Sequence, residues 1–126
     1  MSYKFLIQLA IKNVHLVSVH KSKHFCFIFK NGSLCTFGLN CRIFFQTKDG
    51  KTKYSKHAEE VAIDRLKALT RNTRFNPRHY SIVNIRINSK GELRNSKPCS
   101  GCKSIIDEIG IKKVYASTDA GNIIKV

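Results

Sequence analysis

Long hydrophobic runs, repeats and low-complexity segments are all missing from this sequence of 126 residues. The N-terminal stretch from Phe5 to Ile11 is apolar, but it is shorter than the roughly 20 residues that span a bilayer, and no small-residue cleavage site of a signal peptide follows it. Apolar residues still make up 42% of the chain, which predicts a folded globular protein. Because the length suits one hydrophobic core, we expect a single domain over residues 1–126. We also expect an intracellular protein of a reducing compartment, cytoplasmic or nuclear, with no membrane partner.

Acidic residues are scarce as well. The chain has 8 of them against 23 lysines and arginines, which gives a net charge of +15. This is more than solubility alone requires, and it favours an anionic partner. A generally solvated basic surface is the alternative, because net charge bears on association and not on fold.

The spacing of apolar residues predicts three helices. The first lies within residues 3–19, the second starts near His57 with Ser55 as a candidate N-cap, and the third follows Pro98 and ends at Gly110. The apolar stripe of the second helix consists of Ala58, Val61, Ala62, Leu66 and Leu69, and that of the third consists of Cys99, Cys102, Ile105, Ile106 and Ile109.

Strands are expected at residues 25–30, 33–39, 83–87, 113–117 and 122–126. Asn31-Gly32 separates the first two strands and favours a two-residue hairpin turn. Only about four residues separate the last two strands, so they must be antiparallel if they pair with each other. Residues 41–56 show no sustained periodicity, and we expect a loop there with at most a short strand end.

Cys99 and Cys102 stand one turn apart at the start of the third expected helix. The helix dipole at such an end lowers the pKa of a thiol toward the thiolate that a metal requires. Pro98 before the pair and a third ligand upstream, His57, favour zinc over a redox dithiol. Three protein ligands leave the fourth tetrahedral position open to water, which is typical of catalytic zinc.

The other three cysteines have no assigned role. Without secretory features, five cysteines indicate thiols or metal ligands and not a disulfide framework. Cys26, Cys35 and Cys41 are most simply small buried residues. If one of them were a fourth ligand, the zinc site would be closed and structural.

Glu59 follows His57 by two residues, and in the first turn of a helix both side chains can flank the helix end. A carboxylate at that place can take the proton of zinc-bound water, leaving a hydroxide nucleophile, and can later pass the proton to the substrate. The alternative is an ordinary first-turn acid that is favoured by the helix dipole.

These residues resemble a known signature. His57-Ala58-Glu59 followed by Pro98-Cys99-Ser100-Gly101-Cys102 is similar to the zinc motif of the cytidine deaminase superfamily. The resemblance covers nearly the whole chain and implies an α/β fold with three layers, α-β-α, and a mixed five-stranded sheet that ends in an antiparallel C-terminal hairpin. It also implies that two motif helices present their N-termini to one zinc ion.

The resemblance further implies substrate contacts. Asn40, in Gly38-Leu39-Asn40, would hold the substrate sugar, and the backbone around Ala58 and Ser96 would face the base. For Asn40 the alternative is a polar residue that ends a strand. A histidine first ligand resembles the deoxycytidylate, transfer-RNA adenosine and polynucleotide branches, whereas a closing hairpin resembles the free-nucleoside branch. Ser96-Lys97-Pro98 departs from the Glu-Pro-Cys of many free-nucleotide members.

Cations and aromatic residues are interleaved on both sides of the second helix. They are Arg42, Phe44, Phe45, Lys51, Lys53, Tyr54 and Lys56 before it, and Arg71, Arg74, Phe75, Arg78 and Tyr80 after it. Cations on phosphates and aromatic rings on bases are typical of single-strand binding. The alternatives are core aromatics with solvated cations, or a small phosphorylated substrate.

We therefore expect a zinc-dependent hydrolytic deaminase that converts cytosine to uracil in a nucleoside, a nucleotide or single-stranded DNA or RNA. The metal ligands would be His57, Cys99 and Cys102, and Glu59 would be the proton shuttle. Three alternatives stay open: an adenosine deaminase of the transfer-RNA type, a catalytically silent zinc-stabilised nucleic-acid-binding module, and a redox dithiol. The resemblance also allows a homo-oligomer.

Overall fold

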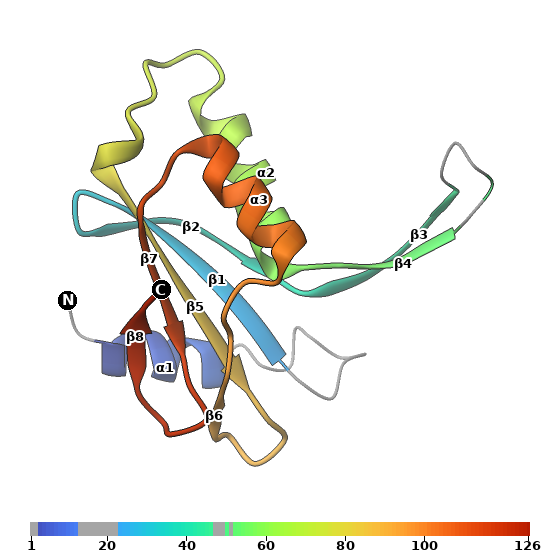
Figure 1. Ribbon diagram of the computed structural model, residues 1–126, viewed down its shortest axis with the longest axis vertical. Coiled ribbons are helices and arrows are strands. Elements are labelled where there is room, and N and C mark those ends of the chain that lie inside the picture. The colour runs from blue at the N-terminus through green and yellow to red at the C-terminus, as the bar shows by residue number, and fades with distance from the viewer. Residues whose placement is uncertain (1–2, 13–22, 47–49, 51) are drawn as a thin grey trace.

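The computed structural model describes residues 3–12, 23–46, 50 and 52–126, with only the backbone path for residues 3, 41–46 and 52–55. The elements, in chain order, are α1 Tyr3–Lys12, β1 Lys23–Lys30, β2 Ser33–Leu39, β3 Cys41–Gln46, β4 Thr52–Lys56, α2 Ala58–Thr70, the 3-10 turn η2 Pro77–His79, β5 Tyr80–Ile87, β6 Leu93–Arg94, α3 Ser100–Ile109, β7 Lys113–Ser117 and β8 Ile123–Lys125 (Figure 1). None of the described helices is long and apolar enough to cross a membrane.

The main sheet is mixed. Its strand order is β2-β1-β5-β7-β8, and the short β6 pairs with β5 beside this path. Only β5 and β7 are parallel among the described pairs, and α3 lies in the connection between them, as a parallel crossover requires. The antiparallel pair β7–β8 closes the chain. The expected five-stranded path and C-terminal hairpin are confirmed, and β6 is an addition that the sequence did not predict.

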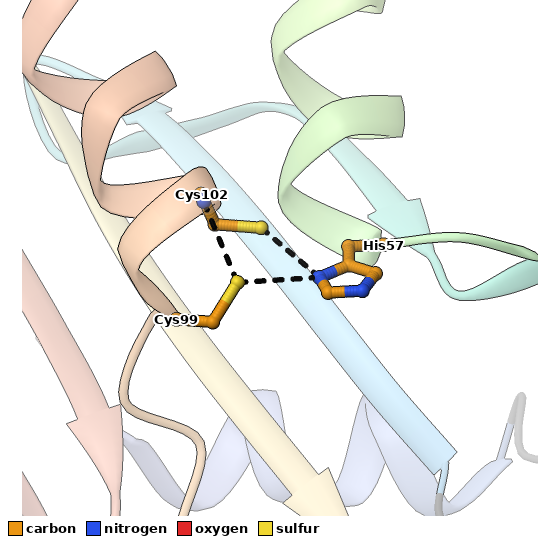
Figure 2. Close-up of side chains that lie close together, drawn as sticks. All are labelled: His57, Cys99 and Cys102. Atoms are coloured by element: carbon orange, nitrogen blue, oxygen red, sulfur yellow. Dashed lines mark hydrogen bonds between the residues drawn. The ribbon is translucent and has the colours of Figure 1, made fainter.

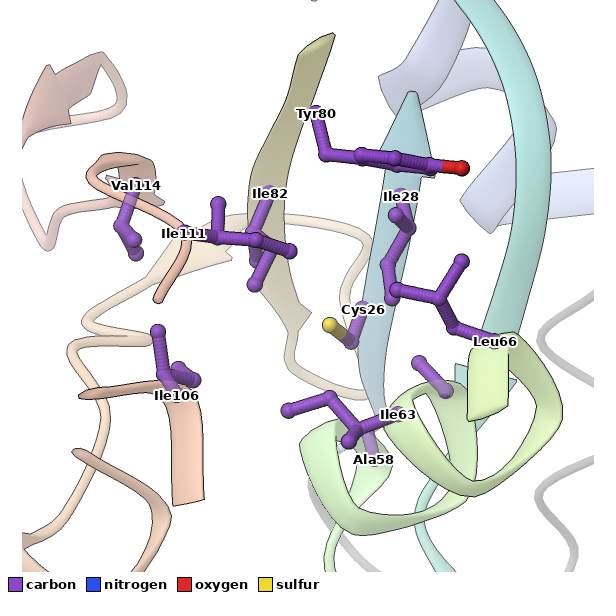
Figure 3. Close-up of a cluster of buried hydrophobic side chains, with 11 residues drawn as sticks. Cys26, Ile28, Ala58, Ile63, Leu66, Tyr80, Ile82, Ile106, Ile111 and Val114 are labelled. Atoms are coloured by element: carbon purple, nitrogen blue, oxygen red, sulfur yellow. The ribbon is translucent and has the colours of Figure 1, made fainter. Parts of the chain in front are cut away.

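Two apolar clusters cover opposite faces of the sheet, because alternate residues of a strand point to opposite sides. On one face, Leu6 and Ala10 of α1 pack with Phe25, Phe27 and other odd-numbered residues of β1 and β5. On the other face, α2 and α3 pack over Cys26, Ile28 and other even-numbered residues of the same strands, as Figure 3 shows. The expected three layers are therefore confirmed.

Short sequence signals account for the ends of several helices and strands. The hairpin of β1 and β2 turns at Asn31 and Gly32, both with positive φ, as predicted. α3 ends at Gly110, whose φ is 89°. The first helix is described only to Lys12, so residues 13–19 of the predicted helix lie outside the described residues.

The predicted loop at residues 41–56 is wrong. β3 and β4 pair antiparallel as a two-stranded ribbon that projects away from the main sheet (Figure 1). Cys41–Gln46 contains Ile43, Phe44 and Phe45, residue types that favour strands, and Asp49-Gly50 is a hairpin signal. Because the ribbon stands apart from the main sheet, that sheet imposes no alternation of apolar and polar residues on it.

Two expectations about α2 also need correction. β4 runs to Lys56, so the N-cap of α2 is His57 and not Ser55. The Glu60 carboxylate accepts a hydrogen bond of 3.2 Å from the backbone N–H of His57, which satisfies one free donor at the helix start. Leu69, placed in the apolar stripe, is 59% exposed because it lies at the last turn of the helix.

Candidate metal centre and proton-transfer site

The N-termini of α2 and α3 meet on one face of the sheet and bring three predicted residues together (Figure 2). His57 is the N-cap of α2, and Cys99 is the N-cap of α3, where its sulfur accepts a hydrogen bond of 3.5 Å from the N–H of Cys102. Cys102 is buried one turn later. The cysteines are thus placed by the cap and the first turn of one helix, and the histidine by the cap of the other.

The ligand atoms of these three residues lie within 4.8 Å of one another. His57 Nδ1 faces both sulfurs, at 3.1 Å from Cys102 Sγ and 3.7 Å from Cys99 Sγ. Tetrahedral zinc with Zn–S of about 2.3 Å and Zn–N of about 2.0 Å would separate such nitrogen and sulfur atoms by about 3.5 Å. The donor set and its spacing therefore fit a zinc ion, and the residues can hold one.

The pKa of the Cys102 thiol differs from the expectation. Burial, reinforced by the Glu59 carboxylate and by Cys99, raises the pKa of Cys102 well above its usual range in the metal-free protein. The predicted lowering by the helix dipole is therefore wrong for this residue, because desolvation of a buried thiolate outweighs the dipole. A metal ion would have to displace the thiol proton on binding.

Glu59 lies in the first turn of α2 and is only 1% exposed. Two polar side chains of the sheet flank its carboxylate. His24 Nε2 lies 3.6 Å from Oε1, and Asn84 Nδ2 lies 3.5 Å from Oε2. A buried carboxylate beside three potential metal ligands is the arrangement that proton transfer at a metal-activated water requires.

Close packing fixes the position of this helix end. Gly38 of β2 has no Cβ, and an added one would lie 2.4 Å from the Ala58 carbonyl oxygen and 2.5 Å from the Ala62 nitrogen. The helix backbone therefore rests directly on β2. Further along α2, Arg65 donates a hydrogen bond of 2.7 Å to the Phe37 carbonyl. Glycine at position 38 is thus required by close approach and not by an unusual φ.

Comparisons with known proteins bear on the fold. No protein-family model and no curated protein matches the chain. Among solved structures, a dCMP deaminase from the cyanophage S-TIM5, in complex with dCMP and dUMP, is 21% identical over 90% of this chain and 79% of that chain, with a TM-score of 0.60. The chain has a cytidine deaminase fold.

Two bacterial cytidine deaminases match over a larger share of the chain. The enzyme of Mycobacterium leprae is 16% identical over 99% of this chain and 93% of its own, and that of Burkholderia pseudomallei is 16% identical over 100% and 92%. Both have TM-scores of 0.62. The resemblance inferred from the two motifs is therefore confirmed for the fold.

The three expected substrate contacts occupy different places in this cytidine deaminase fold. Asn40 follows β2, and its Oδ1 accepts a hydrogen bond of 3.0 Å from the backbone N–H of His24. Ala58 is fully buried at the start of α2. Ser96 is buried too, and its hydroxyl contacts the Asn84 carbonyl and the Ser117 hydroxyl, both at 2.8 Å. Their roles toward a substrate stay predictions.

A fourth protein ligand to the metal, from one of the other three cysteines, was left open as an alternative. Among the described side chains, His57, Cys99 and Cys102 form a group of three that includes neither Cys26 nor Cys35. Burial raises the pKa of Cys26 well above its usual range, which is typical of an inert core thiol. The side chain of Cys41 lies outside the described residues.

Sequence reasoning missed His24 and Asn84. Both belong to strands whose neighbouring apolar residues were recognised, but the pairing of β1 with β5 is what brings them together. The sequence held one signal for Asn84. The apolar residue Ile82 lies two positions before it, on the same side of β5, and indicates that this side of the strand is buried too.

Proposed function

We propose that the protein is a zinc-dependent hydrolytic deaminase that converts cytosine to uracil with release of ammonia. The observation that carries the proposal is the meeting of His57, Cys99 and Cys102 at two helix N-termini, with the buried carboxylate of Glu59 in the same first turn of α2. The dCMP deaminase of similar fold, solved with dCMP and dUMP, supports a cytosine substrate.

His57, Cys99 and Cys102 would hold the zinc ion, which would act as a Lewis acid and activate a water molecule. Glu59 would accept a proton from the attacking water and return it to the ring nitrogen of cytosine. Attack at C4 and loss of the amino group then give uracil and ammonia, and the second proton of the water leaves with the amine. Burial of Glu59 keeps bulk water from competing for these protons.

We further propose that the cytosine belongs to single-stranded nucleic acid. The β3–β4 ribbon runs directly into His57, and it projects from the sheet in a protein of net charge +15. An ion pair between Lys56 and Asp64 ties the end of the ribbon to α2. The sequence of the ribbon interleaves cations with aromatic residues, the combination that binds phosphates and stacks on bases. A free nucleotide would need no such extension.

The test measures bound zinc and ammonia release from cytidine, deoxycytidine, deoxycytidylate, and single-stranded DNA and RNA, for the wild type and for Glu59→Ala. We expect about one zinc per chain in both proteins and ammonia from the wild type alone, with a strand as the best substrate. Ammonia release from free nucleosides or nucleotides only would refute the proposal of a single-stranded substrate. It would leave the proposal of a deaminase intact. No release from any cytosine, followed by release from adenosine or from a strand whose only amino base is adenine, would indicate the adenosine-type alternative.

A further inference from the structure

Three buried polar atoms near the metal centre have no hydrogen-bond partner among the described residues: His24 Nε2, Glu59 Oε1 and Asn84 Oδ1. Buried groups without partners are rare in native proteins, and each one calls for an explanation. Here they belong to Glu59 and to the two residues that flank its carboxylate. The three atoms therefore mark a polar cluster around Glu59.

His24 lies at the start of β1, and Asn40 makes two hydrogen bonds with its backbone. Its N–H donates to Asn40 Oδ1 at 3.0 Å, and its carbonyl accepts from the Asn40 N–H at 3.2 Å. His24 alternates with the α1-facing residues of β1, so its side chain shares the face of Cys26, toward α2. The imidazole is thereby presented to Glu59, with Nε2 at 3.6 Å from Oε1.

Asn84 approaches the same carboxylate from the neighbouring strand. Cys26 of β1 pairs with Asn84 of β5, so His24 and Asn84 lie on adjacent strands. Asn84 is fully buried, and its Nδ2 lies 3.5 Å from Glu59 Oε2 and 3.4 Å from the Ser96 carbonyl. The carboxylate of Glu59 is therefore flanked by one side chain at each oxygen.

We propose that His24 is a positioning residue for Glu59: its neutral imidazole donates from Nε2 to Glu59 Oε1 and, together with Asn84, aims the carboxylate at the metal centre. This inference rests on the proposed deaminase function for its catalytic consequence, but the pairing itself does not depend on turnover. A neutral imidazole carries one proton on its two ring nitrogens. If Nε2 carries that proton and donates it, Nδ1 is unprotonated.

The charge state of His24 agrees with this role. Burial lowers its pKa and outweighs the attraction of Glu59, while the nearby His57 and Arg86 lower it further. A neutral donor orients a carboxylate without forming the ion pair that would weaken it as a base. The contacts at 3.6 and 3.5 Å are longer than ordinary hydrogen bonds, as is common for catalytic groups before substrate binds, and they leave Glu59 able to exchange partners.

The decisive variants are His24→Phe, His24→Asn and His24→Gln. Phenylalanine keeps a ring but has no donor, asparagine places its amide nitrogen near the Nδ1 position, and glutamine reaches the Nε2 position. On the best substrate, we expect His24→Phe and His24→Asn to lower kcat about tenfold to a hundredfold, with KM and bound zinc nearly unchanged. We expect His24→Gln to recover most of kcat. Equal activity in all three variants, or an equal loss in all three, would overturn the positioning role.

A second measurement needs no turnover. Nitrogen NMR of the His24 side chain in the zinc-loaded wild type should show a protonated Nε2 and an unprotonated Nδ1 near neutral pH, and Glu59→Gln should shift the Nε2 signal. An imidazolium, a protonated Nδ1, or no response to Glu59→Gln overturns the pairing. If the wild type releases no ammonia but shows the expected signals, the deaminase proposal fails and the pairing stands.

Discussion

Gly38→Ala is the substitution that most directly tests how the fold positions the metal centre. The added Cβ would lie 2.4 Å from the Ala58 carbonyl oxygen, 2.5 Å from the Ala62 nitrogen and 3.0 Å from the Ala62 Cα. These are backbone atoms, so no side-chain rotation can relieve the contact. The first turn of α2 must retreat by about 1 Å to reach normal contact distances.

That displacement has two consequences. Overpacking at a backbone contact should destabilise the metal-free protein by about 3 kcal/mol, the upper part of the usual range. The same shift moves His57 relative to Cys99 and Cys102, whereas metal–ligand distances tolerate only about 0.2 Å. If a similar free energy is lost from zinc binding, affinity falls about a hundredfold.

The assays are urea unfolding of the metal-free protein and zinc competition against a chromophoric chelator. The matched control is Gly101→Ala in the first turn of α3, where an added Cβ meets only Cys99 Sγ, at 4.0 Å. The control should stay within about 0.5 kcal/mol of the wild type. Wild-type stability and zinc affinity in Gly38→Ala would refute the direct contact of α2 with β2.

Three further variants test the site and the ribbon. Glu59→Gln should stabilise the metal-free protein by about 1–2 kcal/mol in urea unfolding, because it replaces a buried carboxylate whose flanking contacts are longer than ordinary hydrogen bonds, and lower stability would contradict this. Cys102→Ser should abolish the rise in unfolding free energy that zinc gives the wild type, about 4 kcal/mol at a thousandfold excess over Kd, and an undiminished rise would place the metal elsewhere. Arg42→Ala with Lys53→Ala should reduce the slope of log affinity against log salt for single-stranded DNA by about 1.4, while Lys4→Ala on α1 should leave it nearly unchanged.

Signals that act within a few residues could be predicted from the sequence. Asn31 and Gly32 turn the first hairpin, Gly110 ends α3, and the spacing of Cys99 and Cys102 puts both sulfurs at one helix end. Each of these depends on local backbone geometry or on one helical turn. The same reasoning predicted that the three candidate metal ligands lie close together, since they all lie at helix N-termini.

Features that depend on strand pairing could not be predicted in this way. Asn84 is a polar residue within the expected strand at residues 83–87, and it is fully buried because β5 is central and covered on both faces. His24 had no assigned role, because only the pairing of β1 with β5 and the placement of α2 bring it to Glu59. The β3–β4 ribbon escaped prediction because its residues lack the alternation that a sheet with one buried face imposes.

The central claim is that this site performs hydrolytic deamination with Glu59 moving the protons. The most direct measurement is mass spectrometry of the product formed in ¹⁸O-enriched water by zinc-loaded wild type and by Glu59→Gln with equal zinc content. The account predicts that the wild type forms uracil carrying one solvent oxygen at C4 with one ammonia per turnover, and that Glu59→Gln forms at least a hundredfold less. No product from fully loaded wild type on any cytosine or adenine substrate, or equal product from both proteins, would contradict it.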